Sequence, residues 1–362
     1  MENLLSIVNL KKYFPMQKKS FFQRERPFLR ANDGISLDIK KGETFGLVGE
    51  SGCGKSTLGR TVLQLYKPSF GNVFYYGKEV EEFSPQYTKK EETHGAGIDL
   101  TRLTTTEMRT LRKDLQIIFQ DPYSSLNPRM TVGQIIEEGV ATHRFFKRGS
   151  KEMREYVLQV MKDCGLQEFM LHRYPHQFSG GQRQRICIAR ALAVKPKFVV
   201  CDECVSALDV SIQSQILNLL SDLKQKEGLT YLFISHDLSV VRYISDRIAV
   251  MYLGNIVEMG TAKEVFENPR HPYTISLISA IPSTEMTGDG SKRIILKGHM
   301  PSPVYPPSGC KFHTRCFMAC DKCKNGPVAT VEVEKGHFVA CHFADVSTRK
   351  KRELAEKNSV EE

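Results

Sequence analysis

Nine consecutive residues have the types and spacing of a phosphate-binding loop, G-x-x-x-x-G-K-[ST]. Glycines at three of these positions let successive backbone N–H groups turn toward a phosphate. Lys55 would reach the β- and γ-phosphates of a nucleotide, and the Ser56 hydroxyl would bind Mg²⁺. An apolar stretch over 44–48 predicts a buried strand entering the loop, and residues 56–65 predict a helix whose N-terminus faces the anion. The predicted nucleotide site consists of Gly49, Glu50, Ser51, Gly52, Cys53, Gly54, Lys55, Ser56 and Thr57.

Polar side chains at the ends of three other apolar stretches could complete such a site. Asp202 and Glu203 end one of them, and ligands bind at the carboxyl ends of strands in open α/β sheets. Asp202 suits Mg²⁺, whereas Glu203 suits a base that polarises water. Gln120 ends a second stretch and could bind Mg²⁺ or sense the γ-phosphate. His236 follows a third, where we expect a contact with the γ-phosphate.

A second stretch of small residues lies far from the loop in sequence. Phe178 is followed by Ser179, Gly180, Gly181 and Gln182, and a predicted helix comes directly after them. The N-terminus of a helix carries free N–H donors and a partial positive charge. This stretch therefore predicts a second exposed site for an anion.

The elements that must position these residues follow from periodicity. Alternating apolar positions predict strands at 4–10 and 34–40, and helical spacing predicts helices at 132–140 and 151–164. Residues 78–110 are polar and read as a surface insertion. The pattern as a whole is typical of an α/β fold.

Bulk composition limits the class of protein. The chain has 362 residues, 41% of them hydrophobic and 25% charged, which predicts a soluble globular protein of two domains or a domain with an extension. It has neither a run of about 18 apolar residues nor a signal peptide. We therefore expect a location in the cytoplasm or at the inner face of a membrane. The net charge of +10 suits polyanions: nucleotides, nucleic acid or acidic lipid.

Ten cysteines divide into two groups. Five are scattered and read as buried thiols. The other five crowd into the C-terminal region, which in a reducing compartment indicates a metal or iron–sulfur site rather than disulfides. They are Cys310, Cys316, Cys320, Cys323 and Cys341.

Taken in order, these motifs resemble those of the ATP-binding cassette (ABC) ATPases, over residues 1–265. The resemblance implies a P-loop core with a mixed sheet, an antiparallel β subdomain and an α-helical signature subdomain at about 121–182. The remaining motifs of the set are the loop at 206–209, and Phe14 at the position that stacks on adenine. Its neighbour Tyr13 is the alternative for stacking.

The family's chemistry is implied in the same way. Hydrolysis of ATP would use Glu203, His236 and Gln120, with Mg²⁺ bound by Ser56, Gln120 and Asp202. Two cassettes would pair head to tail, so that the signature residues 179–182 cap the ATP of the partner.

The C-terminal part, 266–345, resembles the extension of oligopeptide/dipeptide importer ATPases through residues 271–274, 301–303 and 309–316. Residues 174–176 and 182–186 favour the F-type over the D-type subunit. The departures are Cys204 and Phe317, where the family usually has proline. The charged tail, 346–362, is predicted to be disordered.

This narrower resemblance implies a subunit that energises peptide import. Its partners would be a second, D-type ATPase, two transmembrane permease subunits and an extracytoplasmic solute-binding protein, at the cytoplasmic face of the membrane and without nucleic acid. Import of nickel or another solute is the alternative cargo. A soluble, non-transport ABC ATPase and a redox-sensing regulator are the competing classes.

The resemblance also implies a [4Fe–4S] cluster on Cys310, Cys316, Cys323 and Cys341. Four thiolates match the ligand count of such a cluster. Cys320 forms a C-x-x-C pair with Cys323 and leaves tetrahedral zinc open. Purely structural thiols are the third alternative, and His313, His337 or His342 could replace a ligand.

Overall fold

The computed structural model describes residues 2–17, 26–78, 88–91, 95–281, 294–348, 350–351 and 353–355. It contains two compact units, each built from segments that are distant in sequence. The first unit comprises Met1–Ser6, Asp38–Thr44 and Val73–Ile234, and the second comprises Ile7–Leu37, Phe45–Asn72 and Ser235–Glu362. Within the described ranges, no helix combines the length and the apolar character needed to cross a bilayer.

The first unit contains three parallel strands that pair side by side. They are β7 (Leu115–Ile118), β8 (Phe198–Asp202) and β9 (Thr230–Ile234), in the order β9-β8-β7. Every residue of β8 and β9 is buried, as expected for parallel strands covered on both faces. Because the strands are parallel, their carboxyl ends lie at one edge of the sheet. Gln120 follows β7 at this edge, and Asp202 is the last residue of β8.

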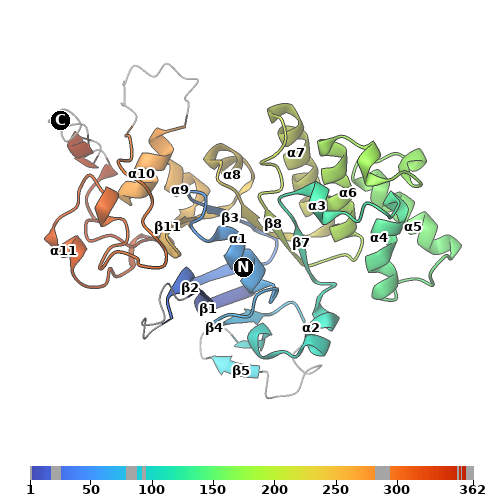
Figure 1. Ribbon diagram of the computed structural model, residues 1–362, viewed down its shortest axis with the longest axis horizontal. Coiled ribbons are helices and arrows are strands. Elements are labelled where there is room, and N and C mark those ends of the chain that lie inside the picture. Colours follow the sequence, from blue (N-terminus) through green and yellow to red (C-terminus); the bar gives the residue numbers. More distant parts are fainter. Residues whose placement is uncertain are drawn as a thin grey trace. The chain divides into compact units, whose positions relative to one another are not determined.

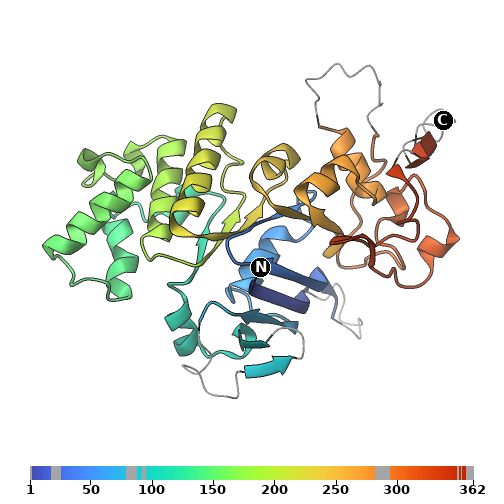
Figure 2. The same cartoon turned by 180° about the vertical axis from the view of Figure 1, so that it is seen from behind.

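Helices make up most of the rest of the first unit. In Figure 1 and in the reverse view of Figure 2, α4, α5 and α6 lie side by side, and they contact one another. Both predicted helices are confirmed, and the apolar residues Met153, Val157, Val160 and Met161 of α5 are buried. The helices and 3₁₀ turns of this region are α3 (Pro122–Ser125), α4 (Val132–Thr142), α5 (Lys151–Asp163), η4 (Glu168–Met170), η5 (Pro175–Gln177), α6 (Gly180–Leu192) and α7 (Val210–Glu227).

The predicted surface insertion is partly regular. Its strands β5 (Thr88–Glu91) and β6 (Gly95–Asp99) pair antiparallel, and β6 also pairs with β4 (Phe70–Tyr75). The 3₁₀ turn η3 (Leu100–Arg102) and helix α2 (Thr105–Leu111) follow. Residues 79–87 and 92–94 lie outside the described ranges.

The second unit contains a mixed sheet in the order β12-β13-β11-β10-β3. β10 pairs in parallel with β3 and antiparallel with β11, which confirms the mixed sheet that the family resemblance implies. The strands of this unit are β1 (Asn3–Pro15), β2 (Phe28–Lys40), β3 (Thr44–Val48), β10 (Arg247–Tyr252), β11 (Asn255–Thr261), β12 (Val331–Glu334) and β13 (His337–Val339), of which the first three also contribute residues to the first unit.

The C-terminal extension belongs to the same unit as the phosphate loop. Its strand β13 pairs with β11, and β12 pairs with β13, so the extension enlarges the sheet that contains β3. The helices and the 3₁₀ turn of the unit are α1 (Lys55–Val62), α8 (Leu238–Ile244), α9 (Ala262–Glu267), α10 (Pro272–Ser279), η6 (His313–Arg315) and α11 (Asp321–Lys324). In Figure 1, α9 lies beside β11, and the two elements are in contact.

A buried polar group fastens the extension to this sheet. Glu258 on β11 and His337 on β13 are both fully buried, and a Glu258 carboxylate oxygen lies 2.8 Å from Nε2 of His337. The same carboxylate accepts the N–H groups of Arg270 at 2.6 Å and His271 at 2.8 Å. A buried carboxylate is stable when its oxygens are hydrogen-bonded in this way. The Nε2 atom of His337 is therefore bound to Glu258, and only its Nδ1 atom could serve as a ligand for the cysteine group.

The predicted disorder of the charged tail does not extend to its first part. The residues described between 348 and 355 are helical. Lys351 is fully buried, and its ammonium donates to the carbonyl oxygen of Arg270. That contact holds the beginning of the tail against the segment that precedes α10 in the same unit. Residues 356–362 lie outside the described ranges.

Candidate nucleotide site

The phosphate loop begins where the sequence predicts it, between strand β3 and helix α1. The Lys55 side chain is 3% exposed, and its ammonium donates to the carbonyl oxygens of Gly49 at 2.8 Å and Glu50 at 3.1 Å. Gly54 has a φ of +108°, and a Cβ there would lie 2.1 Å from the carbonyl oxygen of Ala31. A residue with a side chain cannot occupy this position without moving the backbone. The loop therefore holds the lysine ammonium in a fixed place at the start of α1.

Neighbouring segments fix the rest of the loop. The carbonyl oxygen of Cys53 accepts the N–H of Gly254 at 2.9 Å, and the Asn32 amide donates to the carbonyl oxygen of Gly54 at 3.1 Å. Burial raises the pKa of the Cys53 thiol even though Lys55 is near, so the thiol is neutral and fills space. Helix α1 has no acidic residue in its first turn. Its positive end is therefore available to an anion.

Ser56 and Thr57 lie in the first turn of α1 and are half-buried. Ser51 and Gly52 are exposed at the tip of the loop. The loop thus presents small polar residues outward while its lysine stays buried.

His236 lies close to the strand that enters the loop. The residue before it, Ser235, donates its N–H to the carbonyl oxygen of Leu47 on β3 at 3.1 Å. The residue after it, Asp237, caps helix α8 by accepting the N–H groups of Ser239 and Val240. Both neighbours of His236 are held, and the imidazole itself is exposed.

Phe14 and Tyr13 have different surroundings. The ring of Phe14 is half-buried and meets Tyr66 edge to face, with 5.5 Å between ring centroids. The Tyr13 hydroxyl donates a hydrogen bond to Asp33, and burial with that neighbour raises the pKa of Tyr13 to about 12. Tyr13 is thus committed to Asp33, which favours Phe14 as the stacking residue.

In the first unit, the structure brings Gln120 and Glu203 together. The Gln120 amide donates to a carboxylate oxygen of Glu203 at 2.9 Å. Glu203 is 9% exposed, and the neighbouring Asp202, at the end of β8, is fully buried. Glu203 has a φ of +48°, a conformation that costs a non-glycine residue about 1–3 kcal/mol. Such strain is typical of functional sites, and nothing in the sequence indicates it.

The loop after Glu203 is held by a residue that sequence reasoning missed. The Gln213 amide, one turn into α7, donates to the carbonyl oxygens of Val205 and Leu208, both at 3.0 Å. Cys204, at the position of the expected proline, is 1% exposed. The departure from proline is thus compensated, because Gln213 fixes the loop. The only indication of this role in the sequence is the glutamine itself, near the start of the helix that follows the loop.

The signature stretch forms the N-terminus of α6. Ser179 is the exposed N-cap, and its hydroxyl accepts the N–H of Gln182 at 3.4 Å while the Gln182 side chain accepts the Ser179 N–H at 3.1 Å. A Cβ on Gly181 would lie 2.6 Å from the side chain of Ile212 on α7. The two polar side chains therefore close the helix end, and the glycine lets α6 approach α7.

Two residues of the extension contact the phosphate loop, and the sequence predicted neither contact. The Tyr273 hydroxyl accepts the N–H of Glu50 at 2.9 Å. The Arg315 guanidinium lies 3.0 and 3.1 Å from the two carboxylate oxygens of Glu50. Each side chain lies more than 200 positions from Glu50 in sequence, and no local pattern links residues at that separation.

Four cysteines of the extension influence one another. Burial raises the pKa of Cys310 to about 11 and of Cys316 to about 12, and in both cases the Cys323 and Cys341 thiols add to the rise. The sulfur of Cys320 lies 3.9 Å from that of Cys323. Among the residues that the structure describes, no three His, Cys, Asp or Glu side chains are placed to hold one metal ion.

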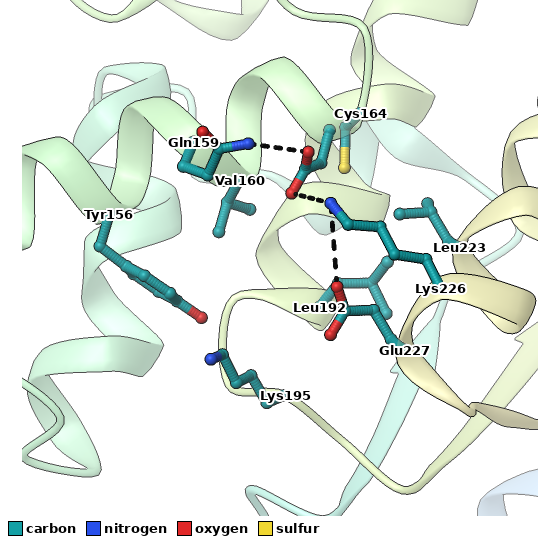
Figure 3. A pocket seen from close by; sticks show the side chains of 10 residues that line it. Tyr156, Gln159, Val160, Cys164, Leu192, Lys195, Leu223, Lys226 and Glu227 are labelled. Atoms are coloured by element: carbon teal, nitrogen blue, oxygen red, sulfur yellow. Dashed lines mark hydrogen bonds and ion pairs between the residues drawn. The ribbon is translucent and has the colours of Figure 1, made fainter.

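The first unit also contains a pocket of about 440 Å³, between the C-terminal halves of α5, α6 and α7 (Figure 3). Lys226 on its wall lies 2.9 Å from Asp163 and 3.9 Å from Glu227. The Tyr156 hydroxyl donates to the carbonyl oxygen of Ala193 at 2.7 Å. Lys226 thus pairs with both acidic residues, and none of the predicted site residues lines the pocket.

Comparison with known protein families gives two matches. The family described as "ABC transporter" matches residues 32–206, and the family described as "Oligopeptide/dipeptide transporter, C-terminal region" matches residues 257–323.

Curated relatives match nearly the whole chain. The oligopeptide transport ATP-binding protein AppF of Bacillus subtilis is 47% identical over 94% of this chain and 98% of its own length. The oligopeptide transport ATP-binding protein OppF of Escherichia coli is 47% identical over 94% of this chain and 96% of its own. The dipeptide transport ATP-binding protein DppF of Haemophilus influenzae is 44% identical over 94% and 97%.

Solved structures share the fold of the cassette. The dimeric, post-hydrolysis state of the ATP-binding cassette MJ0796 bound to ADP and Pi has a TM-score of 0.59 and 27% identity, over 71% of this chain and 98% of that one. CbiO1 of Clostridium perfringens, part of the ABC transporter complex cbiONQ, has a TM-score of 0.57 and 26% identity, over 74% and 92%.

Proposed function

The chain belongs to the ABC transporter ATP-binding proteins of the oligopeptide/dipeptide transport family, and from this premise we propose that it hydrolyses ATP to drive peptide import. The observation that carries the ATPase activity is the phosphate loop with its buried, pre-placed Lys55 ammonium. The 47% identity to oligopeptide transport ATP-binding proteins supports peptides over nickel or another solute as cargo. The matches over nearly the full length favour a transport subunit over a soluble, non-transport ATPase.

Each predicted site residue has a role in this proposal. Lys55 binds the β- and γ-phosphates, and Phe14 stacks on adenine. Glu203 polarises the attacking water, Gln120 orients the Glu203 carboxylate, and His236 contacts the γ-phosphate. Most of the rate in phosphoryl transfer comes from positioning and from stabilisation of charge.

Mg²⁺ fits the residues that would hold it. The Ser56 hydroxyl, the Gln120 side-chain oxygen and the Asp202 carboxylate are oxygen donors, the ligand type that Mg²⁺ takes. When bound, the ion neutralises charge on the phosphate oxygens.

The proposed division of the chain follows function rather than compactness. Residues 1–265 form the nucleotide-binding domain, with a helical subdomain at 121–182, and residues 266–345 form the extension. The family matches at 32–206 and 257–323 support this division.

The exposed N-terminus of α6 supports a head-to-tail dimer. We propose that residues 179–182 cap the ATP of a second, D-type ATPase subunit. Two transmembrane permease subunits and an extracytoplasmic solute-binding protein would complete an importer, with this chain on the cytoplasmic face of the membrane and no nucleic acid involved.

A [4Fe–4S] cluster on Cys310, Cys316, Cys323 and Cys341 remains our proposal for the extension. The support is the match of these four thiolates to the ligand count of such a cluster. Among the residues that the structure describes, the side chains are not placed to hold one ion, so binding would have to draw the thiols together. Cys320 is left outside the proposed ligand set because the family resemblance assigns the four positions to the other cysteines, although its sulfur lies 3.9 Å from that of Cys323. A tetrahedral zinc site is the alternative, and measuring the metal content of the protein distinguishes it from the cluster.

Reconstitution tests the proposed function. The chain is assembled with its permease and second ATPase in vesicles that enclose ATP, and solute-binding protein loaded with an oligopeptide, a dipeptide or Ni²⁺ is added outside. We expect peptide to stimulate hydrolysis and to accumulate inside the vesicles. Stimulation by Ni²⁺ alone would reject peptide as the cargo, and hydrolysis that ignores every solute and the permease would favour the soluble class.

A further inference from the structure

Glu50 places a negative charge inside a loop whose task is to bind phosphates. Its carboxylate is 28% exposed and forms a two-pronged ion pair with Arg315, which is 8% exposed. Bidentate guanidinium–carboxylate pairs are the strong and geometrically specific ones. The pair neutralises a charge that would otherwise repel a triphosphate.

The backbone of Glu50 is held as firmly as its side chain. Its N–H donates to the Tyr273 hydroxyl at 2.9 Å. Its carbonyl oxygen accepts from the Lys55 ammonium at 3.1 Å and from the Cys53 N–H at 3.3 Å. A residue fixed by the extension thus supplies one of the two carbonyl oxygens that place Lys55.

The groups that hold Glu50 are themselves rigid. Tyr252, Tyr273 and Phe312 are at most 1% exposed, and their rings meet with centroids 4.8 to 5.3 Å apart. The Arg315 guanidinium lies 6.0 Å from the centre of the Tyr252 ring. Burial alone would lower the pKa of Arg315, but Tyr252 and the Glu50 carboxylate raise it. Arg315 is therefore charged at every physiological pH.

We propose that Arg315 and Tyr273 are positioning residues for ATP binding, which act through Glu50 and make the nucleotide affinity of the loop depend on the C-terminal extension. This inference rests on the proposed function, because it takes ATP as the ligand of the loop. Neither residue contacts the nucleotide in the proposal. Arg315 cancels the Glu50 charge, and Tyr273 fixes the Glu50 backbone from which Lys55 is placed.

A series of charge-removing variants of the full chain tests the proposed charge cancellation between Arg315 and Glu50. The dissociation constant of a fluorescent ATP analogue is measured for wild type, Arg315→Ala, Glu50→Gln and the double variant, at low and high salt. We expect Arg315→Ala to weaken binding by about 10- to 100-fold at low salt, because an unpaired carboxylate is left beside the phosphates. High salt should reduce that loss, because exposed charges are screened. The double variant should return to within about threefold of wild type, since it has no charge left to cancel.

Controls separate this effect from damage to the fold. Arg270→Ala removes an arginine of the same unit from another ion pair, with Glu334 on β12, and should leave the affinity unchanged. Tyr273→Phe removes only the hydroxyl and should weaken binding by about three- to tenfold. If Arg315→Ala does not fold, Arg315→Lys and Glu50→Gln carry the test. Each should lose less than tenfold in affinity, because neither leaves an unpaired negative charge beside the phosphates.

Three outcomes would overturn the inference: unchanged affinity in Arg315→Ala, equally weak binding by the double variant, or a tenfold loss in Glu50→Gln alone. A wild-type chain that binds no ATP would instead reject the proposed function, so the two failures are distinguishable.

Discussion

Replacing Glu203 by glutamine should separate hydrolysis from ATP binding. Glutamine has the same size, and its side-chain oxygen can still accept the Gln120 hydrogen bond, which is 2.9 Å long in the structure. Asp202 remains available to Mg²⁺. The substitution therefore removes only the base. A positioned general base contributes about 10²- to 10⁴-fold in rate, which corresponds to roughly 3–5 kcal/mol of barrier.

The assay is turnover by the assembled transporter, with ATP affinity measured in parallel. We expect kcat to fall at least 100-fold, about the lower limit for a general base, while ATP affinity and thermal stability stay close to wild type. The matched variant Gln120→Ala leaves the carboxylate in place and removes its hydrogen-bond donor, so it should reduce kcat by a smaller factor. A Glu203→Gln transporter that hydrolyses ATP at near wild-type rate would refute the assignment of the base.

Three further predictions address stability, partnership and the cysteine group. Burial lowers the pKa of His271 to about 3, so below about pH 6.5 the unfolded state binds a proton that the folded state does not. The free energy of unfolding should therefore be lower at pH 5 than at neutral pH by roughly 2 kcal/mol. Denaturant titration at the two pH values should show that His271→Asn removes this difference. Ser179→Arg should abolish turnover of the complex while this chain still binds ATP at its own loop. Loss of photo-labelling of that loop by an ATP analogue would reject the proposal that Ser179 caps the ATP of the partner subunit. Protein purified without oxygen should be brown and contain about four iron and four sulfide per chain. The Cys316→Ser variant should lose the colour, and the Cys320→Ser variant should keep it. A colourless protein that contains about one zinc per chain would favour the zinc site.

Much of the nucleotide site was predictable because its chemistry is local in sequence. The glycines, Lys55 and Ser56 fall within nine consecutive positions, and the strand and helix on either side have plain apolar patterns. Gln120 and Glu203 could each be placed at the end of a strand. Their direct hydrogen bond could not be predicted, because it joins residues 83 positions apart.

The contacts that escaped prediction are long-range. No periodicity or turn signal connects Arg315 with Glu50, and the left-handed backbone of Glu203 has no sequence marker, since glutamate rarely adopts it. The helical residues described between 348 and 355 were missed for another reason: a highly charged composition predicts disorder, and the sequence does not show that Lys351 is buried. Local patterns predict elements, whereas packing between distant segments decides such details.

The pairing of β13 with β11 has a consequence for synthesis of the chain. The loop leaves the ribosome early, but its partner Arg315 follows 265 residues later, which at about 5–20 residues per second is a delay of roughly 13–53 s. Strand β11 ends 76 positions before β13 begins, which at the same rate is a delay of roughly 4–15 s. Until β13 emerges, β11 lacks the strand that pairs with its outer edge, and unpaired strand edges recruit other chains. Nascent chains are thus exposed to aggregation until the last strands of the extension emerge. The extension is therefore the last part of the chain needed to complete the sheet of the second unit.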